Sequence, residues 1–191
     1  MKWFSEYNFI LASKSPRRQQ LLRSLDIDFT VQTKDVEEVY PAGMLKEQVP
    51  VFLAELKAKP FLHELTDKDL LITADTIVCL GNNILGKPGS FHEAFDMLQN
   101  LSGKQHQVIT GVCLTSLKKS KSFSALTNVT VKNLTKEEIE YYIETYQPYD
   151  KAGAYGIQEW IGSIGITSIE GSFYNVMGLP IQKLYEQIQR F

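Results

Sequence analysis

Hydrophobic residues in this chain gather in short runs, and several of these runs have the length and composition of β-strands. The clearest covers residues 70–80 and is rich in Leu, Ile, Val and Thr, which favour strands. The Gly-Asn-Asn sequence at 81–83 then predicts a tight turn into a short partner strand at 84–85. By the same pattern we expect further strands at residues 7–12, 29–32, 108–117, 123–134 and 164–169.

Helix starts are marked by capping residues between these strands. Ser15 followed by Pro16 predicts a helix with the serine as N-cap and the proline at its first position. Pro50 predicts the start of a second helix, which Pro60 should end or kink. Two further starts fit the capping-box pattern, at Ser90 with Glu93 and at Thr135 with Glu138. A closing amphipathic helix is expected at residues 180–188.

The order of these elements predicts the fold class. Because helices and strands interleave, we expect an α/β or α+β protein with a mixed sheet. The adjacent strands at 108–117 and 123–134 should pair antiparallel, which argues against a purely parallel sheet. With 191 residues, the chain predicts one domain, or one domain with a sub-lobe. It is long enough to fold around its own core.

Charge and composition exclude several classes of protein. There are 20 Lys and Arg against 22 Asp and Glu, which gives a net charge of −2 and argues against binding nucleic acid by bulk electrostatics. Cys79 and Cys113 stand far apart in apolar runs, so we expect buried free thiols rather than a disulfide framework or a zinc site. No apolar stretch approaches the length of a membrane helix. The N-terminus lacks the pattern of a signal peptide, so the expected location is the cytoplasm.

The first candidate for chemistry is the basic sequence Ser-Lys-Ser-Pro-Arg-Arg at residues 13–18, which follows a strand and opens a helix. Free backbone N–H groups at a helix start suit anions, and Arg17 and Arg18 could grip a phosphate. The alternative is a capped surface helix with solvated arginines.

Acidic residues and a lysine form the next candidates. Asp75 lies inside an apolar strand, where a carboxylate needs a partner, a metal or a role in proton transfer; the alternative is a strand-end Asp that caps a turn. Lys87 follows the predicted hairpin, and by itself it reads more simply as a turn lysine. Glu38 becomes interesting only as a second carboxylate for Mg²⁺, and otherwise belongs to a solvated acidic loop.

Residues 151–158, Lys-Ala-Gly-Ala-Tyr-Gly-Ile-Gln, combine small residues with a polar end. Glycines let a backbone approach a ligand closely, and the Gln158 amide offers both donors and an acceptor. The alternative is a tight connection between elements. His106 stands at a strand start, where a structural role is favoured over a catalytic one. Taken together, the cationic and acidic candidates fit phosphoryl-type hydrolysis.

These motifs resemble those of the Maf nucleotide pyrophosphatases. The matching segments occur in family order and span most of the chain: LASKSPRR at 11–18, LAELKA at 53–58, ADTIV at 74–78, GKP at 86–88, SGK at 102–104 with His106, TGV at 110–112, KAGAYGIQ at 151–158 and GSFYNVMGLP at 171–180.

The resemblance implies an elongated, two-lobed mixed-sheet α/β fold similar to that of inosine triphosphatases, with residues 1–191 forming one domain around a cleft. It implies hydrolysis of a nucleoside triphosphate to the monophosphate and pyrophosphate with Mg²⁺ or Mn²⁺. The sequence at 152–158 is typical of the branch that acts on dTTP and UTP, with modified pyrimidine nucleotides as further candidates. The resemblance also allows a homodimer.

Individual roles follow from the same resemblance. Asp75 would be the catalytic acidic residue and Glu38 would help it to hold the metal. Thr76 and Gln158 would influence the choice of base. The phosphates would be held by cationic and hydroxyl groups: Ser13, Arg17, Arg18, Lys57 and Lys87.

The sequence departs from the family pattern at two places, and the smaller departure is Gln105, which stands where threonine is common. After Gln158 the family continues with glycines, whereas this chain has Glu159 and Trp160, and these alter the rim of the expected base pocket. The alternative function is a non-catalytic nucleotide-binding regulator of cell division and septum formation, because family members are linked to that process. Such a regulator could lose its acidic residues, so the presence of both Asp75 and Glu38 favours the enzyme.

Overall fold

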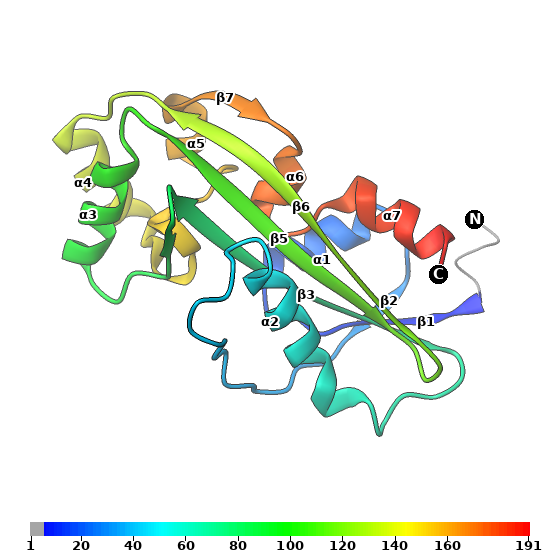
Figure 1. The fold of residues 1–191 in the computed structure, drawn as a ribbon. Helices are drawn as coiled ribbons and strands as arrows, with labels where there is room; N and C mark the ends of the chain where they lie inside the picture. Colours follow the sequence, from blue (N-terminus) through cyan, green and yellow to red (C-terminus); the bar gives the residue numbers. More distant parts are fainter. Residues whose placement is uncertain (1–5) are drawn as a thin grey trace. The chain divides into compact units, whose positions relative to one another are not determined.

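A computed structural model describes residues 6–191, and its strands form one mixed sheet (Figure 1). The sheet order is β2-β1-β3-β5-β6-β7, with β4 paired to β3. Strand β1 runs parallel to both β2 and β3, whereas the β3–β4 and β6–β7 pairs are antiparallel. The strands are β1 (Asn8–Leu11), β2 (Phe29–Val31), β3 (Asp69–Leu80), β4 (Asn83–Leu85), β5 (Gln105–Thr115), β6 (Ser120–Val131) and β7 (Ile166–Glu170). The predicted α/β class with a mixed sheet is therefore confirmed.

Helices and short 3₁₀ turns connect these strands. The helices are α1 (Pro16–Arg23), α2 (Val49–Ala58), α3 (Phe91–Leu101), α4 (Lys136–Tyr146), α5 (Trp160–Gly165), α6 (Phe173–Met177) and α7 (Ile181–Gln189). The 3₁₀ turns are η2 (Lys59–Phe61), η3 (Pro148–Asp150) and η4 (Ala152–Ala154). The predicted helix starts hold to within one residue. Helices α5 and α6 were not predicted, because they are too short to show a helical repeat of apolar residues.

The predicted caps form, with one difference. The Ser15 hydroxyl accepts from the Arg18 N–H, and Thr135 and Glu138 make a complete capping box. At α3 the Ser90 hydroxyl accepts from the Glu93 N–H as expected. The Glu93 carboxylate, however, accepts from the N–H of Gly89 at 2.7 Å, one residue before the cap. The second hydrogen bond of the predicted capping box therefore comes from the N–H of Gly89 instead of that of Ser90. It still satisfies a backbone donor at the helix start.

The β5–β6 hairpin confirms the predicted antiparallel pair. Ser116 N donates to Lys119 O at the turn, and Val131 N donates to Lys104 O at the far end of the pair. Both strands begin and end a few residues earlier than the hydrophobic pattern indicates. Their exact limits depend on which backbone groups find partners in the sheet.

The chain divides into two compact units. Unit 1 comprises the described residues up to Asp75, with Thr110–Ala125 and Gly178–Phe191; unit 2 comprises Thr76–Ile109 and Leu126–Met177. The division falls between Asp75 and Thr76, inside strand β3.

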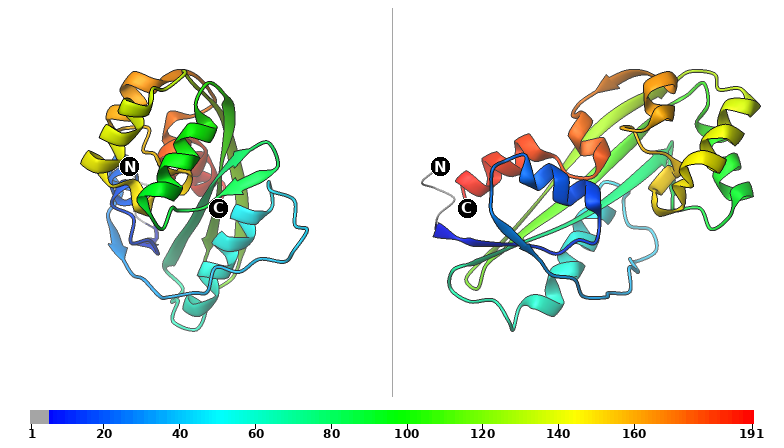
Figure 2. Two further views of the ribbon diagram at one scale, coloured as in Figure 1. Left: turned by 90° about the vertical axis from the view of Figure 1, so that its left-hand side faces the viewer. Right: turned by 180° about the vertical axis from the view of Figure 1, so that it is seen from behind.

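In unit 1, helices α1 and α7 lie on one face of the strands and α2 lies on the other (Figure 1, Figure 2). Helix α2 packs on a core that includes Ile10, Leu71 and Cys113. A Cβ added at Gly111 of β5 would lie 2.3 Å from the backbone of Pro50. The start of α2 therefore rests directly on the strand, and only glycine permits this approach.

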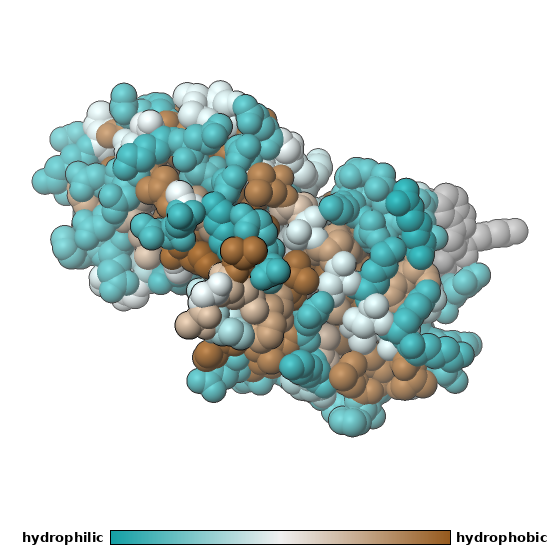
Figure 3. Space-filling model, in the orientation of Figure 1, coloured by the Kyte–Doolittle hydropathy of each residue, from teal (hydrophilic) through white to brown (hydrophobic). Residues whose placement is uncertain are grey.

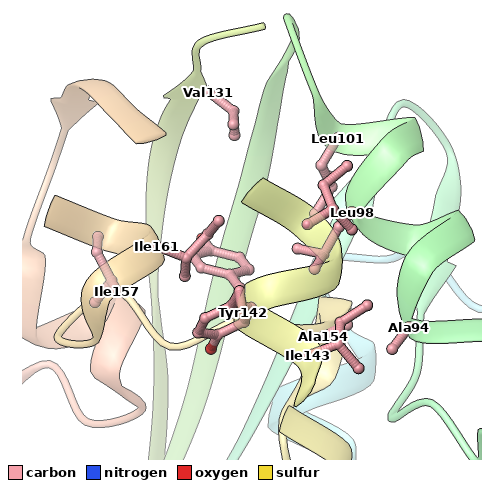
Figure 4. Packing of buried hydrophobic residues seen from close by; sticks show 11 residues of the cluster. Ala94, Leu98, Leu101, Val131, Tyr142, Ile143, Ala154, Ile157 and Ile161 are labelled. Carbon is pink, nitrogen blue, oxygen red and sulfur yellow. The ribbon is translucent and has the colours of Figure 1, made fainter. Parts of the chain in front are cut away.

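In unit 2, helices α3, α4 and α5 share a core with η4 and the segment after it. Figure 4 shows the ring of Tyr142 from α4 among apolar side chains of this core, including Leu98, Ile157 and Ile161. Ile157 is 5% exposed, so the chain just before Gln158 is fixed by burial of an apolar side chain.

His106 belongs to this part of the structure and has no sign of a catalytic role. It is 1% exposed, and its Nε2 lies 2.8 Å from the hydroxyl of Tyr155. Its Nδ1 has no hydrogen-bond partner among residues 6–191. Protonation would place an N–H donor without an acceptor at Nδ1, and burial lowers the pKa of His106 to about 4.

We expect this histidine to make unfolding dependent on pH. The unfolded chain binds the proton near a pKa of about 6.5 and the folded protein only near 4, so stability is complete above that window and falls as the pH is lowered through it. Between about pH 7.5 and 5 the wild type should lose roughly 2 kcal/mol more than a His106→Gln variant. Urea unfolding of both proteins at the two pH values measures this difference, and equal losses would contradict it.

Both cysteines are buried and neither is part of a disulfide among the described residues, as predicted. Within residues 6–191, no helix has the length and apolar character needed to cross a membrane. The face drawn in Figure 3 mixes hydrophilic and hydrophobic residues. Exposed apolar side chains such as Val39 and Leu45 are common on folded proteins and need no partner.

Candidate active site

The turn between β1 and α1 closes through its own serine hydroxyls. Ser13 is buried, and its hydroxyl accepts from the N–H of Ser15 at 3.2 Å. Gln19 donates to the carbonyl of Ser13 at 3.2 Å. The sequence therefore folds this segment as predicted, with a capped helix start directly after a buried strand. The Ser13 hydroxyl still has its proton to donate to an anion.

Arg18 also has a structural role, which the sequence analysis did not predict: it donates hydrogen bonds to two backbone carbonyls. Its Nε donates to the carbonyl of Gly178 and its Nη1 to that of Ala74, both at 2.8 Å. Ala74 directly precedes Asp75, so the guanidinium holds the backbone that carries this carboxylate. Burial lowers the pKa of Arg18, and the negative charges of Asp75 and Glu38 oppose the shift. The group remains a cation at neutral pH. Arg17 beside it is half-buried.

Asp75, Lys57 and Glu38 come together in unit 1. The Lys57 ammonium lies 2.6 Å from Oδ1 of Asp75 and 3.0 Å from Oε1 of Glu38. The Asp75 side chain is only 10% exposed, and a carboxylate buried to this degree is stabilised by a bonded cation. One ammonium therefore connects two carboxylates that the sequence singled out separately.

The packing of α2 on β3 explains how Lys57 reaches Asp75. The Thr73 hydroxyl donates to the carbonyl of Ala54 at 2.7 Å. Thr73 and Asp75 lie two residues apart and so share one face of the strand. Ala54 and Lys57 lie three apart and so share one face of the helix. The hydrogen bond between Thr73 and Ala54 therefore places Asp75 next to Lys57.

The same two carboxylates fit a divalent cation bound together with phosphates. Asp75 and Glu38 already share a positive group, the Lys57 ammonium, so their oxygens converge on one point. Mg²⁺ commonly takes one or two carboxylates and completes its shell with water and phosphate oxygens. In the part of the chain from residue 6 onward, no group of three or more His, Cys, Asp and Glu could form a complete protein cage. These residues therefore suit a cation that arrives with, or is completed by, a phosphorylated ligand.

The remaining predicted residues belong to unit 2. Thr76 is half-buried, whereas Lys87 and Gln158 are exposed. The N–H of Gly153 donates to the carbonyl of Gly86 at 3.0 Å. This bond ties the segment that bears Lys87 to the segment that leads to Gln158.

A group that sequence reasoning missed holds the turn at Gln158. Glu159 forms an ion pair with Lys151, 3.1 Å between Oε1 and Nζ, and accepts a hydrogen bond from the hydroxyl of Tyr142. The same hydroxyl accepts from the N–H of Gly156 at 3.0 Å. Burial, followed by the hydrogen bond to Glu159, raises the pKa of Tyr142, which keeps its hydroxyl protonated. Tyr142 carries no local sequence signal, because it reads as one more apolar position of a helix.

Comparisons with known proteins agree with the motifs. A sequence model of the family described as "Maf-like protein" matches residues 8–191. A protein of Bacteroides thetaiotaomicron named dTTP/UTP pyrophosphatase is 52% identical over 186 residues, which cover 97% of this chain and 96% of that protein. A protein of Porphyromonas gingivalis with the same name is 51% identical over 189 residues, covering 97% and 95%.

A protein of Flavobacterium johnsoniae, also named dTTP/UTP pyrophosphatase, is 51% identical over 186 residues, which cover 96% of this chain and 94% of that protein. Among solved structures, the Staphylococcus aureus Ham1 protein matches with a TM-score of 0.48 and 16% identity, covering 65% of this chain and 71% of that chain.

Proposed function

The chain belongs to the Maf-like protein family, and we propose that it is a nucleoside triphosphate pyrophosphatase that hydrolyses dTTP and UTP to the monophosphate and pyrophosphate. The observation that carries the proposal is the cluster of Asp75, Lys57 and Glu38, with Arg18 beside it. It combines a proton acceptor with cations that offset phosphate charge. The names of the relatives supply the substrate class.

In the proposed reaction, a water oxygen forms a bond to the α-phosphorus of the nucleotide. The bond from that phosphorus to the oxygen bridging the α- and β-phosphates breaks, and its electron pair leaves with pyrophosphate. Asp75 accepts the proton of the attacking water. Lys57, Arg17 and Arg18 offset negative charge that develops on the phosphates.

A divalent cation, Mg²⁺ or Mn²⁺, held by Asp75 and Glu38 would supply further charge neutralisation and acidify the water. Ser13 would donate its hydroxyl proton to a phosphate oxygen. Roles for Thr76 and Lys87 in binding the nucleotide stay predictions from the family resemblance. Four expectations stay predictions from the sequence and its family resemblance. They are a cleft between two lobes, a cytoplasmic location, a homodimer and the absence of nucleic-acid binding.

The test of this function is the product formed from UTP. Purified protein incubated with UTP and Mg²⁺ or Mn²⁺ should release UMP and pyrophosphate. Release of orthophosphate would contradict the proposed bond cleavage. The alternative, a non-catalytic regulator of septum formation, is not favoured by the pyrophosphatase relatives, and it predicts binding of UTP without any product.

Gln158 is the residue proposed to read the base. Uracil and thymine present an N–H donor between two carbonyl acceptors, and a primary amide can pair with that edge by donating one hydrogen bond and accepting another. Cytosine presents a different order of groups. Gln158 is exposed, next to buried Ile157, so its amide lies at a surface while the preceding residue is fixed.

A Gln158→Ala variant should therefore lower kcat/KM for UTP and dTTP by about 5- to 150-fold, the range expected when the polar edge of the bound base loses its hydrogen-bond partner. The value for CTP should change much less. Steady-state kinetics with the three nucleotides measure the preference. If all three fall by the same factor, Gln158 braces the loop and the base is read elsewhere.

A further inference from the structure

Gln158 lies in a tight turn whose two ends are bound to a single hydroxyl. The N–H of Glu159 donates to the carbonyl of Gly156 at 3.0 Å, which closes the turn around Ile157 and Gln158. The Tyr142 hydroxyl accepts from the N–H of Gly156 and donates to the carboxylate of Glu159. One side chain from α4 therefore bonds the backbone at one end of the turn, at Gly156, and the side chain of Glu159 at the other end.

The surroundings of this hydroxyl leave little freedom. Tyr142 is 0% exposed, and the side chains of Lys151 and Glu159 are 8% and 19% exposed. Lys151 also pairs with Asp150 at 2.7 Å. A Cβ added at Gly156 would lie 2.7 to 3.0 Å from the carboxylate atoms of Glu159, so glycine is required for the carboxylate to lie against the backbone there.

The ion pair by itself is a weak reason for this arrangement. Burying two charges costs solvation that their attraction only partly returns, so apolar replacements are often as stable. Charge-assisted hydrogen bonds are shorter and more directional than neutral ones, and they suit a role in fixing geometry. Glu159 directly follows Gln158 in the sequence, so its bonds to Lys151 and Tyr142 act on the turn that carries Gln158.

We infer that Tyr142, Glu159 and Lys151 form a clamp that positions the Gln158 amide for uracil and thymine, and so determine nucleotide preference without touching the nucleotide. The inference rests on the proposed function of Gln158. It assigns three positioning residues to base selection, because a fixed turn limits the positions that the Gln158 amide can reach. Binding then loses less side-chain and backbone entropy.

The decisive variant is Tyr142→Phe, which keeps the ring in the core and removes the hydroxyl. We expect kcat/KM for UTP and dTTP to fall about tenfold, mainly through a higher KM, with CTP changed by less than about twofold. Tyr141→Phe is the matched control, because Tyr141 is the neighbouring residue of the same helix, is 50% exposed and contacts Trp160 through its ring. It should leave all three values unchanged.

A double-mutant cycle separates positioning from general damage. If the clamp acts through Gln158, adding Tyr142→Phe to Gln158→Ala should change the UTP/CTP preference no further. Additive effects, or an equal loss for UTP and CTP in Tyr142→Phe, would overturn the inference. Should Tyr142→Phe fail to fold in a thermal melt, Glu159→Gln carries the test. It removes the charge facing Lys151 and should lower the UTP/CTP preference by about threefold or more; an unchanged preference overturns the clamp.

The experiments distinguish a wrong assignment of the clamp from a wrong assignment of the function. A wild-type protein that releases no pyrophosphate from UTP contradicts the function itself. A wild-type enzyme whose preference for UTP is lost in Gln158→Ala but kept in Tyr142→Phe contradicts only the clamp.

Discussion

An Asp75→Asn variant should hydrolyse UTP about 10²- to 10⁴-fold more slowly than the wild type, with further loss from weakened cation binding. The amide keeps the shape of the carboxylate and can still accept a hydrogen bond from Lys57, which lies 2.6 Å from Oδ1. It cannot take a proton from water and carries no charge for a cation. The measurement is kcat for UTP, with circular dichroism to confirm the fold.

Asp69→Asn is the matched control for this experiment. Asp69 lies on the same strand, and its carboxylate accepts hydrogen bonds from Asn8 and Thr66 outside the cluster. The Asp69→Asn variant should have a lower free energy of unfolding and a kcat close to the wild-type value. A folded Asp75→Asn protein that keeps most of its activity would remove Asp75 from the reaction.

The second large effect is expected at Lys57. A Lys57→Met variant should lower kcat/KM for UTP by about 10²- to 10³-fold, as when one donor to the transition state is removed. It also leaves Asp75 and Glu38 without the ammonium that now lies between them. Two carboxylates attract a divalent cation more strongly when no ammonium lies between them. In the absence of nucleotide, the Lys57→Met variant should therefore bind Mn²⁺ more tightly than the wild type.

Titration with Mn²⁺, followed by calorimetry or electron paramagnetic resonance, tests this second result independently of activity. Lys34→Met is the control, since Lys34 pairs with Glu64 elsewhere in unit 1. It should alter neither kcat/KM nor Mn²⁺ affinity. Weaker Mn²⁺ binding by Lys57→Met than by the wild type would contradict a cation site at Asp75 and Glu38.

Local sequence determined much of the fold. The Ser15-Pro16 cap, the Thr135–Glu138 capping box and the apolar run of β3 each depend on neighbouring residues, so they are readable without a structure. The sequence pattern did not predict α5, and it assigned the Glu93 carboxylate to the N–H of Ser90 rather than to that of Gly89. Short helices and carboxylates at helix ends depend on the groups packed around them, which a local pattern does not show. Asp75 stood out by itself, since a carboxylate in an apolar strand requires an explanation.

The relations among these residues were decided only by tertiary structure. Lys57 meets Asp75 because α2 packs on β3 through the Thr73 hydroxyl, and Arg18 donates to Gly178, which lies 160 residues away in the sequence. No local pattern encodes such pairs, since they depend on how buried surfaces of distant elements fit together. Tyr142 is the sharpest case. Its sequence context shows only an apolar helix position, and its hydroxyl acquires a role because the core directs it to both ends of the Gln158 turn.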